Sequence, residues 1–78
     1  MISVKYFGAV AEKTKSQGEN VVSADKTLQE LLEDLKQKYD LGSLSFSIAV
    51  NQKIVQDTKS YVLNTNDVVA LLPPFAGG

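Results

Sequence analysis

The sequence has 78 residues, 44% of them hydrophobic, which is enough apolar material for one domain with a single core. It contains no cysteine and no histidine, so the composition excludes disulfides and thiolate metal ligands, disfavours catalysis by the chain alone and leads us to expect no metal site. Its eight basic residues are lysines spread along a chain of net charge −1, so we expect no binding to nucleic acid, which needs a concentrated positive face. No apolar run approaches the ~20 residues of a membrane span. We therefore expect a soluble, cytoplasmic protein that does not bind a membrane.

The first predicted element is a strand over Ile2–Phe7, where residues alternate with a period of two. The alternation places Phe7 on the face opposite the strand's other large apolar side chains. Those side chains are Ile2, Val4 and Tyr6. Gly8 ends the strand, and the polar stretch after it can hold a short helical turn at Ala9–Glu12. A second, shorter strand is predicted at Val21–Val22.

A helix is predicted over Leu28–Tyr39. Thr27 followed by Glu30 is a capping-box pattern, in which each side chain satisfies a backbone N–H near the other residue. Apolar residues recur at helical spacing and predict one buried stripe. The stripe consists of Leu28, Leu31, Leu32, Leu35 and Tyr39. Acidic residues lie early and lysines late, as the helix dipole favours, and Asp40–Gly42 ends the helix.

The second half of the chain predicts strands separated by turns. A strand with alternating apolar residues over Phe46–Val50 leads into a turn at Asn51–Gln52. Two short strands are predicted at Ile54–Val55 and Tyr61–Leu63. The next turn is Asn64–Asp67, because its asparagines tolerate positive φ and its aspartate can accept hydrogen bonds from nearby backbone amides.

The last predicted strand, Val68–Leu72, is apolar on both faces, which favours a central place in a sheet. Val69 and Leu71 are assigned to the core by parity, and Ala70 and Leu72 to the other face. The whole order, strand-strand-helix-strand-strand-strand, predicts an α+β domain over residues 1–78. In it, a mixed sheet of about four to five strands wraps around one main helix. This is the β-grasp arrangement of ubiquitin-like proteins, although other small α+β folds fit the pattern as well.

The sequence closes on LLPPFAGG. Pro73 and Pro74 have a fixed φ and no backbone donor, so they end the strand and direct the following chain away from the sheet. Gly77 and Gly78 lack a Cβ and permit close approach inside a narrow site. We therefore interpret residues 73–78 as an extended functional tail that can enter a narrow site of another protein.

Four stretches of the chain resemble the small subunit of molybdopterin synthase. They are VKYFGAVAE at residues 4–12, the helix start at Thr27, AVN at residues 49–51 and NDVVALLPPFAGG at residues 66–78. Three features, at four positions, depart from the family pattern. Asn66 stands in place of glycine, Ala11 stands where many members have a basic residue, and Phe75-Ala76 replaces a small aliphatic residue followed by Ser or Thr.

The resemblance implies a sulfur carrier in molybdenum cofactor biosynthesis that is not an enzyme on its own and binds no cofactor. An adenylating enzyme would use ATP to activate the Gly78 carboxylate, and a sulfurtransfer system would convert it to a thiocarboxylate. The tail would then donate sulfur to a cyclic pyranopterin phosphate in the large subunit. The resemblance also implies a complex of two small and two large subunits.

A docking patch is expected beside the tail. Phe7, Leu72 and Ile54 would gather on the sheet face away from the helix and, with Pro73, Pro74, Phe75 and Ala76, contact the large subunit and the activating enzyme. Three other functions stay open: the sulfur carrier of thiazole synthesis, a ubiquitin-like modifier of lysines, and a passive β-grasp interaction module. Glu30, Glu33 and Asp34 are read as a solvated helix face.

Overall fold

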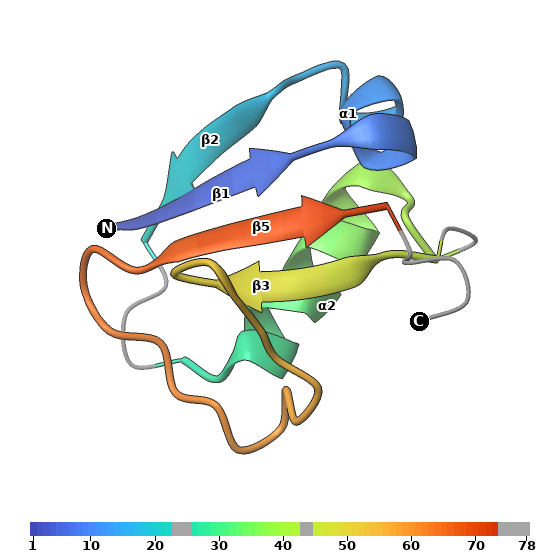
Figure 1. Ribbon diagram of the computed structural model, residues 1–78. Coiled ribbons are helices and arrows are strands. Elements are labelled where there is room, and N and C mark those ends of the chain that lie inside the picture. The colour runs from blue at the N-terminus through green and yellow to red at the C-terminus, as the bar shows by residue number, and fades with distance from the viewer. Residues whose placement is uncertain (23–25, 43–44, 74–78) are drawn as a thin grey trace.

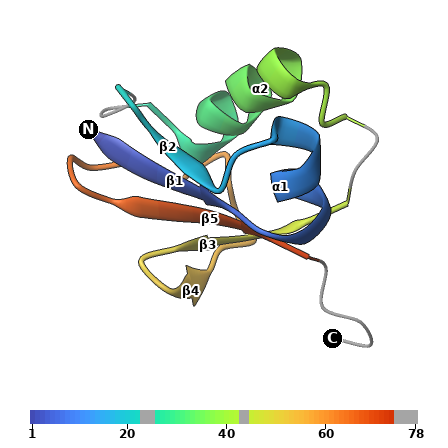
Figure 2. The same ribbon diagram turned by 90° about the horizontal axis from the view of Figure 1, so that it is seen from above.

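The structure is a computed structural model that describes residues 1–22, 26–42 and 45–73 (Figure 1). Its elements in chain order are β1 (Ile2–Tyr6), α1 (Gly8–Thr14), β2 (Gly18–Val21), α2 (Leu28–Tyr39), β3 (Ser47–Val50), β4 (Lys53–Ile54) and β5 (Val68–Leu72). The strands form one sheet in the order β2-β1-β5-β3-β4. The pair β1 and β5 is parallel, and the other pairs are antiparallel. Figure 2 shows α2 lying over one side of this sheet, so the predicted β-grasp fold is confirmed.

The core lies between α2 and the sheet. β5 is in the middle of the sheet, as its two apolar faces predicted, and Val69 and Leu71 are fully buried. Their neighbours Ala70 and Leu72 are only partly buried because they lie on the opposite face. Parity along one strand therefore separates the core from the outer face. Within the described part of the chain, neither helix is long and apolar enough to cross a membrane.

Local signals in the sequence set both ends of α2. The Thr27 side chain accepts from the Glu30 amide at 3.2 Å, and the Glu30 carboxylate accepts from the Thr27 amide at 3.1 Å. Asp40 ends the helix in the left-handed conformation, and its backbone N–H donates to the Lys36 carbonyl. The predicted capping box and helix bounds are thus confirmed. The leucines of the stripe are buried as expected: Leu28, Leu31, Leu32 and Leu35.

The buried leucines make a direct stability prediction. Leu31 and Leu35 are 1% and 3% exposed, so truncation of either to alanine should cost about 2–5 kcal/mol of unfolding free energy through lost burial and a residual cavity. Urea unfolding followed by circular dichroism measures this loss. Gln37→Ala, at an exposed position of the same helix, is the matched control and should change stability by less than about 0.5 kcal/mol. Equal stability of the Leu31 and control variants would contradict the placement of the core.

Several predicted bounds were wrong. The helical turn expected at Ala9–Glu12 is a longer helix, α1, and Phe7 is its N-cap rather than a strand residue. Val22 lies outside β2. Tyr61–Leu63 forms only a single bridge, between Val62 and Thr27. Its backbone groups bond to the chain that enters α2: the Leu28 N–H donates to the Tyr61 carbonyl, and the Leu63 N–H donates to the Lys26 carbonyl. Similarly, Phe46 precedes β3 and Val55 follows β4.

Candidate functional site

An apolar groove lies on the sheet face away from α2. Phe7 is 43% and Ile54 49% exposed, and Leu72 is partly buried beside them. We call the groove the docking groove and define it by its apolar lining: Phe7, Ala49, Ile54, Val68, Ala70 and Leu72. Lys5, Asn51 and Gln52 complete the lining. The structure therefore brings together the three residues that the sequence assigned to a docking patch.

Strand register explains the shape of the groove. Ala49 of β3 lies opposite Ala70 of β5 and opposite Ile54 of β4, and Ala70 lies opposite Lys5 of β1. One row across four strands thus has two alanines at its centre and longer side chains at its ends. The small central side chains leave a depression, and Phe7 and Leu72 lie at the end of the sheet where β5 finishes. Sequence reasoning missed Ala49 because cross-strand neighbours depend on register.

A polar cluster joins the turn between β3 and β4, which lines the groove, to the chain at the start of β5. Asn51 and Gln52 have φ of 52° and 71°, which confirms the predicted turn. The side-chain nitrogen of Asn51 donates to the Asp67 carboxylate at 3.0 Å, and the side-chain oxygen of Asn51 accepts from the backbone N–H of Val68 at 3.0 Å. Asp67 also accepts from the Asn64 amide at 2.8 Å. Asp67 therefore has the structural role that its place in a turn predicted, and Asn66 has a positive φ of 74°.

The tail residues named in the sequence analysis are Pro74, Phe75, Ala76, Gly77 and Gly78, and they lie outside the described residues. Pro73 is exposed and directly follows β5. Leu72, which lines the docking groove, is therefore one residue from the start of the tail. A protein that covers the groove would also be next to the segment that leads to Gly78.

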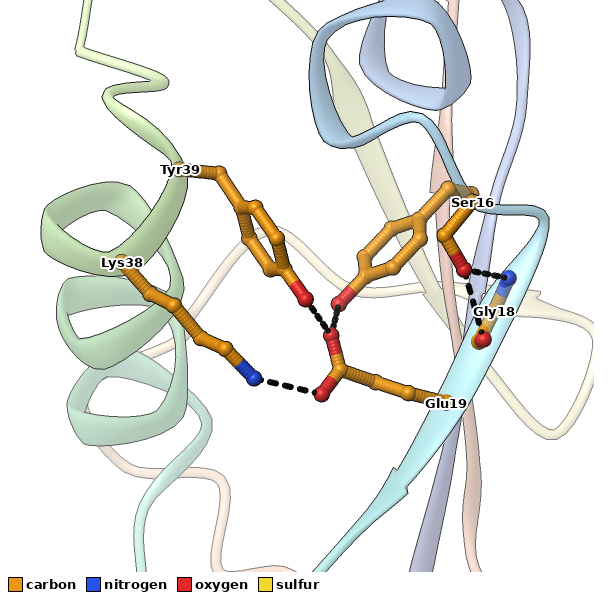
Figure 3. Close-up of polar contacts among 6 residues, drawn as sticks. Ser16, Gly18, Glu19, Lys38 and Tyr39 are labelled. Carbon is orange, nitrogen blue, oxygen red and sulfur yellow. Dashed lines mark hydrogen bonds and ion pairs between the residues drawn. The ribbon is translucent and has the colours of Figure 1, made fainter.

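A second polar cluster was not predicted. Glu19 of β2 lies between two tyrosines and a lysine (Figure 3): Tyr6 donates to one carboxylate oxygen at 2.6 Å, Tyr39 donates to the same oxygen, and Lys38 contacts the other at 2.8 Å. The two tyrosine rings meet edge to face with centroids 5.9 Å apart. Glu19 is paired with Val4 in the sheet, so parity on β2 could have shown a carboxylate on the core face.

The electrostatics of this cluster fix its protonation state. Burial disfavours the charged carboxylate, but hydrogen bonds from Lys38, Tyr39 and Tyr6 outweigh burial and lower the pKa of Glu19 to about 2. Burial, together with the Glu19 carboxylate, raises the pKa of the Tyr6 phenol well above its ordinary value. At neutral pH the cluster is one carboxylate held by three donors. It ties β2 to α2 and has no group ready for proton transfer.

Glu19 should make stability depend on acid. Because its folded pKa is about 2 against an ordinary 4.5, the stabilisation is complete above pH 4.5 and is lost as the pH falls toward 2. One pKa unit corresponds to about 1.4 kcal/mol, and solvent around the half-exposed Lys38 reduces the total to the order of 1–2 kcal/mol. Glu19→Gln should lose this amount at pH 7, and the difference from wild type should vanish near pH 2. Urea unfolding at both pH values measures it, and a difference that does not change with pH would contradict this role.

The fold and the groove together define a class: a small ubiquitin-like domain with an apolar sheet face beside the end of its last strand. Residues 4–78 match the model of the ThiS family, and the chain belongs to that family. This match and the solved structures described next confirm the inferred resemblance at the level of a ubiquitin-like sulfur carrier.

Solved structures with the same fold are similar over nearly the whole chain. Subunit 1 of the molybdopterin-converting factor from Helicobacter pylori, solved in a complex with subunit 2, is 29% identical with a TM-score of 0.72, covering 99% of this chain and 97% of that one. A putative molybdopterin converting factor subunit 1 from Pyrococcus furiosus is 22% identical with a TM-score of 0.82, covering 95% and 97%. SAMP1 from Haloferax volcanii is 24% identical with a TM-score of 0.77, covering 99% and 98%. The last two likenesses concern the fold alone.

Proposed function

We propose that this chain is a sulfur carrier whose Gly78 carboxylate becomes a thiocarboxylate and donates its sulfur during the synthesis of molybdopterin. The observation that carries the proposal is the docking groove, whose lining includes Leu72, the residue directly before the tail. Family membership over residues 4–78 supports the same conclusion, because the matched region includes Gly77 and Gly78. The chain is not an enzyme on its own; its partners supply the catalytic groups, and the reaction takes place in the cytoplasm.

The chemistry begins with a carboxylate, which is a poor acyl donor until one oxygen becomes part of a leaving group. Attack of the Gly78 carboxylate on the α-phosphate of ATP, in an activating enzyme, forms an acyl-adenylate and releases pyrophosphate. A sulfur nucleophile at the oxidation level of sulfide then attacks the acyl carbon and displaces AMP, which leaves a thiocarboxylate. Its sulfur attacks an oxygen-bearing side-chain carbon of the pterin, where the new C–S bond replaces a C–O bond and the oxygen leaves as water or with the phosphate. Hydrolysis of the resulting acyl-sulfur bond then leaves the sulfur on the pterin and restores the carboxylate. A dithiolene needs two such donations.

The acceptor is a cyclic pyranopterin phosphate held by a large subunit, in a complex of two small and two large subunits. The Helicobacter pylori relative supports this partner, because that subunit 1 was solved in complex with subunit 2. An apolar face of one small domain suits such a contact, since aromatic and aliphatic side chains dominate the buried centre of protein interfaces. In this arrangement the groove provides the binding energy and the tail provides the reacting atom.

The test is the mass of the intact chain after incubation with the activating enzyme, ATP and a sulfur source. We expect the mass change of one oxygen replaced by sulfur, located at Gly78 by fragmentation, and no change when ATP is omitted. The chain that carries the thiocarboxylate is then divided among three acceptors: the large subunit with the cyclic pterin, a thiazole synthase, and a mixture of lysine-containing proteins. Molybdopterin formation with the first alone supports the proposal. Sulfur delivery only to the thiazole enzyme, or lysine conjugates only, would replace it with one of the alternatives.

A further inference from the structure

Gly8 lies directly against the proline that follows β5. Its φ is +59°, in the left-handed region where glycine is favoured. A Cβ at this position would be 2.8 Å from Pro73 Cγ and 3.7 Å from Pro73 Cβ and Cδ. The first distance is far shorter than a van der Waals contact, and a proline ring cannot rotate away as a flexible side chain can. Any side chain at residue 8 must therefore displace Pro73.

The chain around Gly8 already holds the end of β5. Tyr6 is paired with Leu71, and the Phe7 amide donates to the Leu71 carbonyl at 3.1 Å. In Figure 2 the end of β5 passes beside the turn where β1 leads into α1. The hydrogen bond holds β5 to the β1 side as far as Leu71, Leu72 is paired with Ser47 of β3, and the contact with Gly8 comes at the next residue, Pro73. Pro73 itself is exposed and has no amide hydrogen, so a packing contact of its ring is what can orient it.

We propose that Gly8 is a positioning residue for the tail: its missing side chain lets the Pro73 ring lie against the backbone, and this contact sets the direction in which the chain leaves the sheet toward Gly78. The inference rests on the proposed function, in which a partner threads that segment into an active site. Gly78 is the fifth residue after Pro73, and an extended residue spans about 3.5 Å. A small tilt at Pro73 is therefore amplified to more than the ~1 Å error that already lowers rates in such sites.

Two substitutions at Gly8 separate positioning from backbone strain. Gly8→Ala introduces both a strained φ and a Cβ against the ring. Gly8→Asn introduces the same Cβ, but asparagine tolerates the left-handed region better than alanine. A merely structural role predicts that asparagine restores both stability and activity. Positioning predicts that asparagine restores stability relative to alanine while activity remains low.

Pro73→Ala provides the rescue. This change removes Cγ and Cδ and keeps Cβ, which is an ordinary 3.7 Å from a Cβ at residue 8. Gly8→Ala in the Pro73→Ala background should therefore have little further effect on activity. Gly42→Ala is the matched control, because a Cβ there meets nothing within 4 Å. The wild type, the single variants Gly8→Ala and Pro73→Ala, and the double variant form a double-mutant cycle that isolates the contact.

The readouts are kcat/KM for adenylation of the full chain by its activating enzyme, the melting temperature, and the amide NMR shifts of residues 75–78. We expect kcat/KM to fall by about 100-fold for Gly8→Ala and Gly8→Asn and to be unchanged for Gly42→Ala. In the Pro73→Ala background the further loss should be less than about threefold, since the close contact is gone.

Wild-type rates for Gly8→Asn, or the same 100-fold loss with and without the Pro73 ring, would overturn the inference while leaving the sulfur carrier intact. A wild-type chain that is never adenylated would instead refute the proposed function. In that case the amide shifts decide alone. The amide shifts of residues 75–78 are compared for Gly8→Asn in the wild-type chain and in the Pro73→Ala background. Shifts that change only in the chain with Pro73 support the positioning contact, and unchanged shifts overturn it.

Discussion

Phe7→Glu and Leu72→Glu should each weaken binding of the large subunit by at least ~30-fold, since the loss of a central interface side chain costs about 2 kcal/mol or more. Both residues line the docking groove, and a glutamate there would have to lose its water against apolar surface. The fold should survive, because Phe7 is 43% exposed and its amide hydrogen bond to Leu71 does not involve the side chain. Titration of the large subunit by calorimetry measures the affinity, and size-exclusion chromatography measures assembly into the proposed complex of two small and two large subunits.

Val62→Glu is the matched control for these variants. Val62 is 52% exposed, but it pairs with Thr27 at the start of α2 and does not line the groove. The same change from an apolar side chain to a carboxylate should leave binding within threefold of wild type there. If all three variants bind equally well, the groove is not the docking surface. If all three bind equally poorly, added negative charge rather than the groove explains the loss.

The fold could be predicted where short-range signals decide structure. The capping box at Thr27 and Glu30, the leucine stripe and the turns at Asn51 and Asn66 depend on residues within a few positions of one another. The expected strand at Tyr61–Leu63 failed because its backbone groups bond to the segment that enters α2, more than thirty positions earlier in the chain. A strand needs a partner over several residues, and local pattern cannot show that the partner is available for only one bridge.

The site divides in the same way. Alternation along β1 and β5 was enough to put Phe7 and Leu72 on the outer face, because parity is a property of one strand. The alanines that make the groove concave depend on the register between β3 and β5. The Glu19 cluster joins β2 to α2, and the contact of Gly8 with Pro73 joins the start of α1 to the residue that follows β5. Both are tertiary contacts, and the pattern within one segment does not show which residue of the other segment it will meet.

Removal of Gly78 should abolish sulfur transfer, with a loss of at least ~10²-fold in the rate of thiocarboxylate formation, because the reacting carboxylate is then displaced by one residue. The fold should be unaffected, since the buried core comprises residues between Ile2 and Leu71. One alanine added after Gly78 should have the same effect, because it moves the carboxylate in the other direction and adds a Cβ. Gly77→Val tests the width of the partner's channel separately, through a branched side chain one residue before the reacting group.

Intact mass after incubation with the activating enzyme, ATP and a sulfur source measures thiocarboxylate formation for each of these tail variants, and thermal unfolding reports the fold. Binding of the large subunit gives a third, independent readout. Because Phe7, Ile54 and Leu72 of the docking groove are unchanged in the chain without Gly78, we expect that chain to bind the large subunit nearly as tightly as wild type and so to inhibit molybdopterin formation by the wild-type chain. Phe7→Glu should show the opposite pattern toward the large subunit, with an intact terminal carboxylate but no inhibition. Sulfur transfer at the wild-type rate by the chain without Gly78 would refute the sulfur-carrier proposal altogether, because the proposal assigns the reacting carboxylate to Gly78.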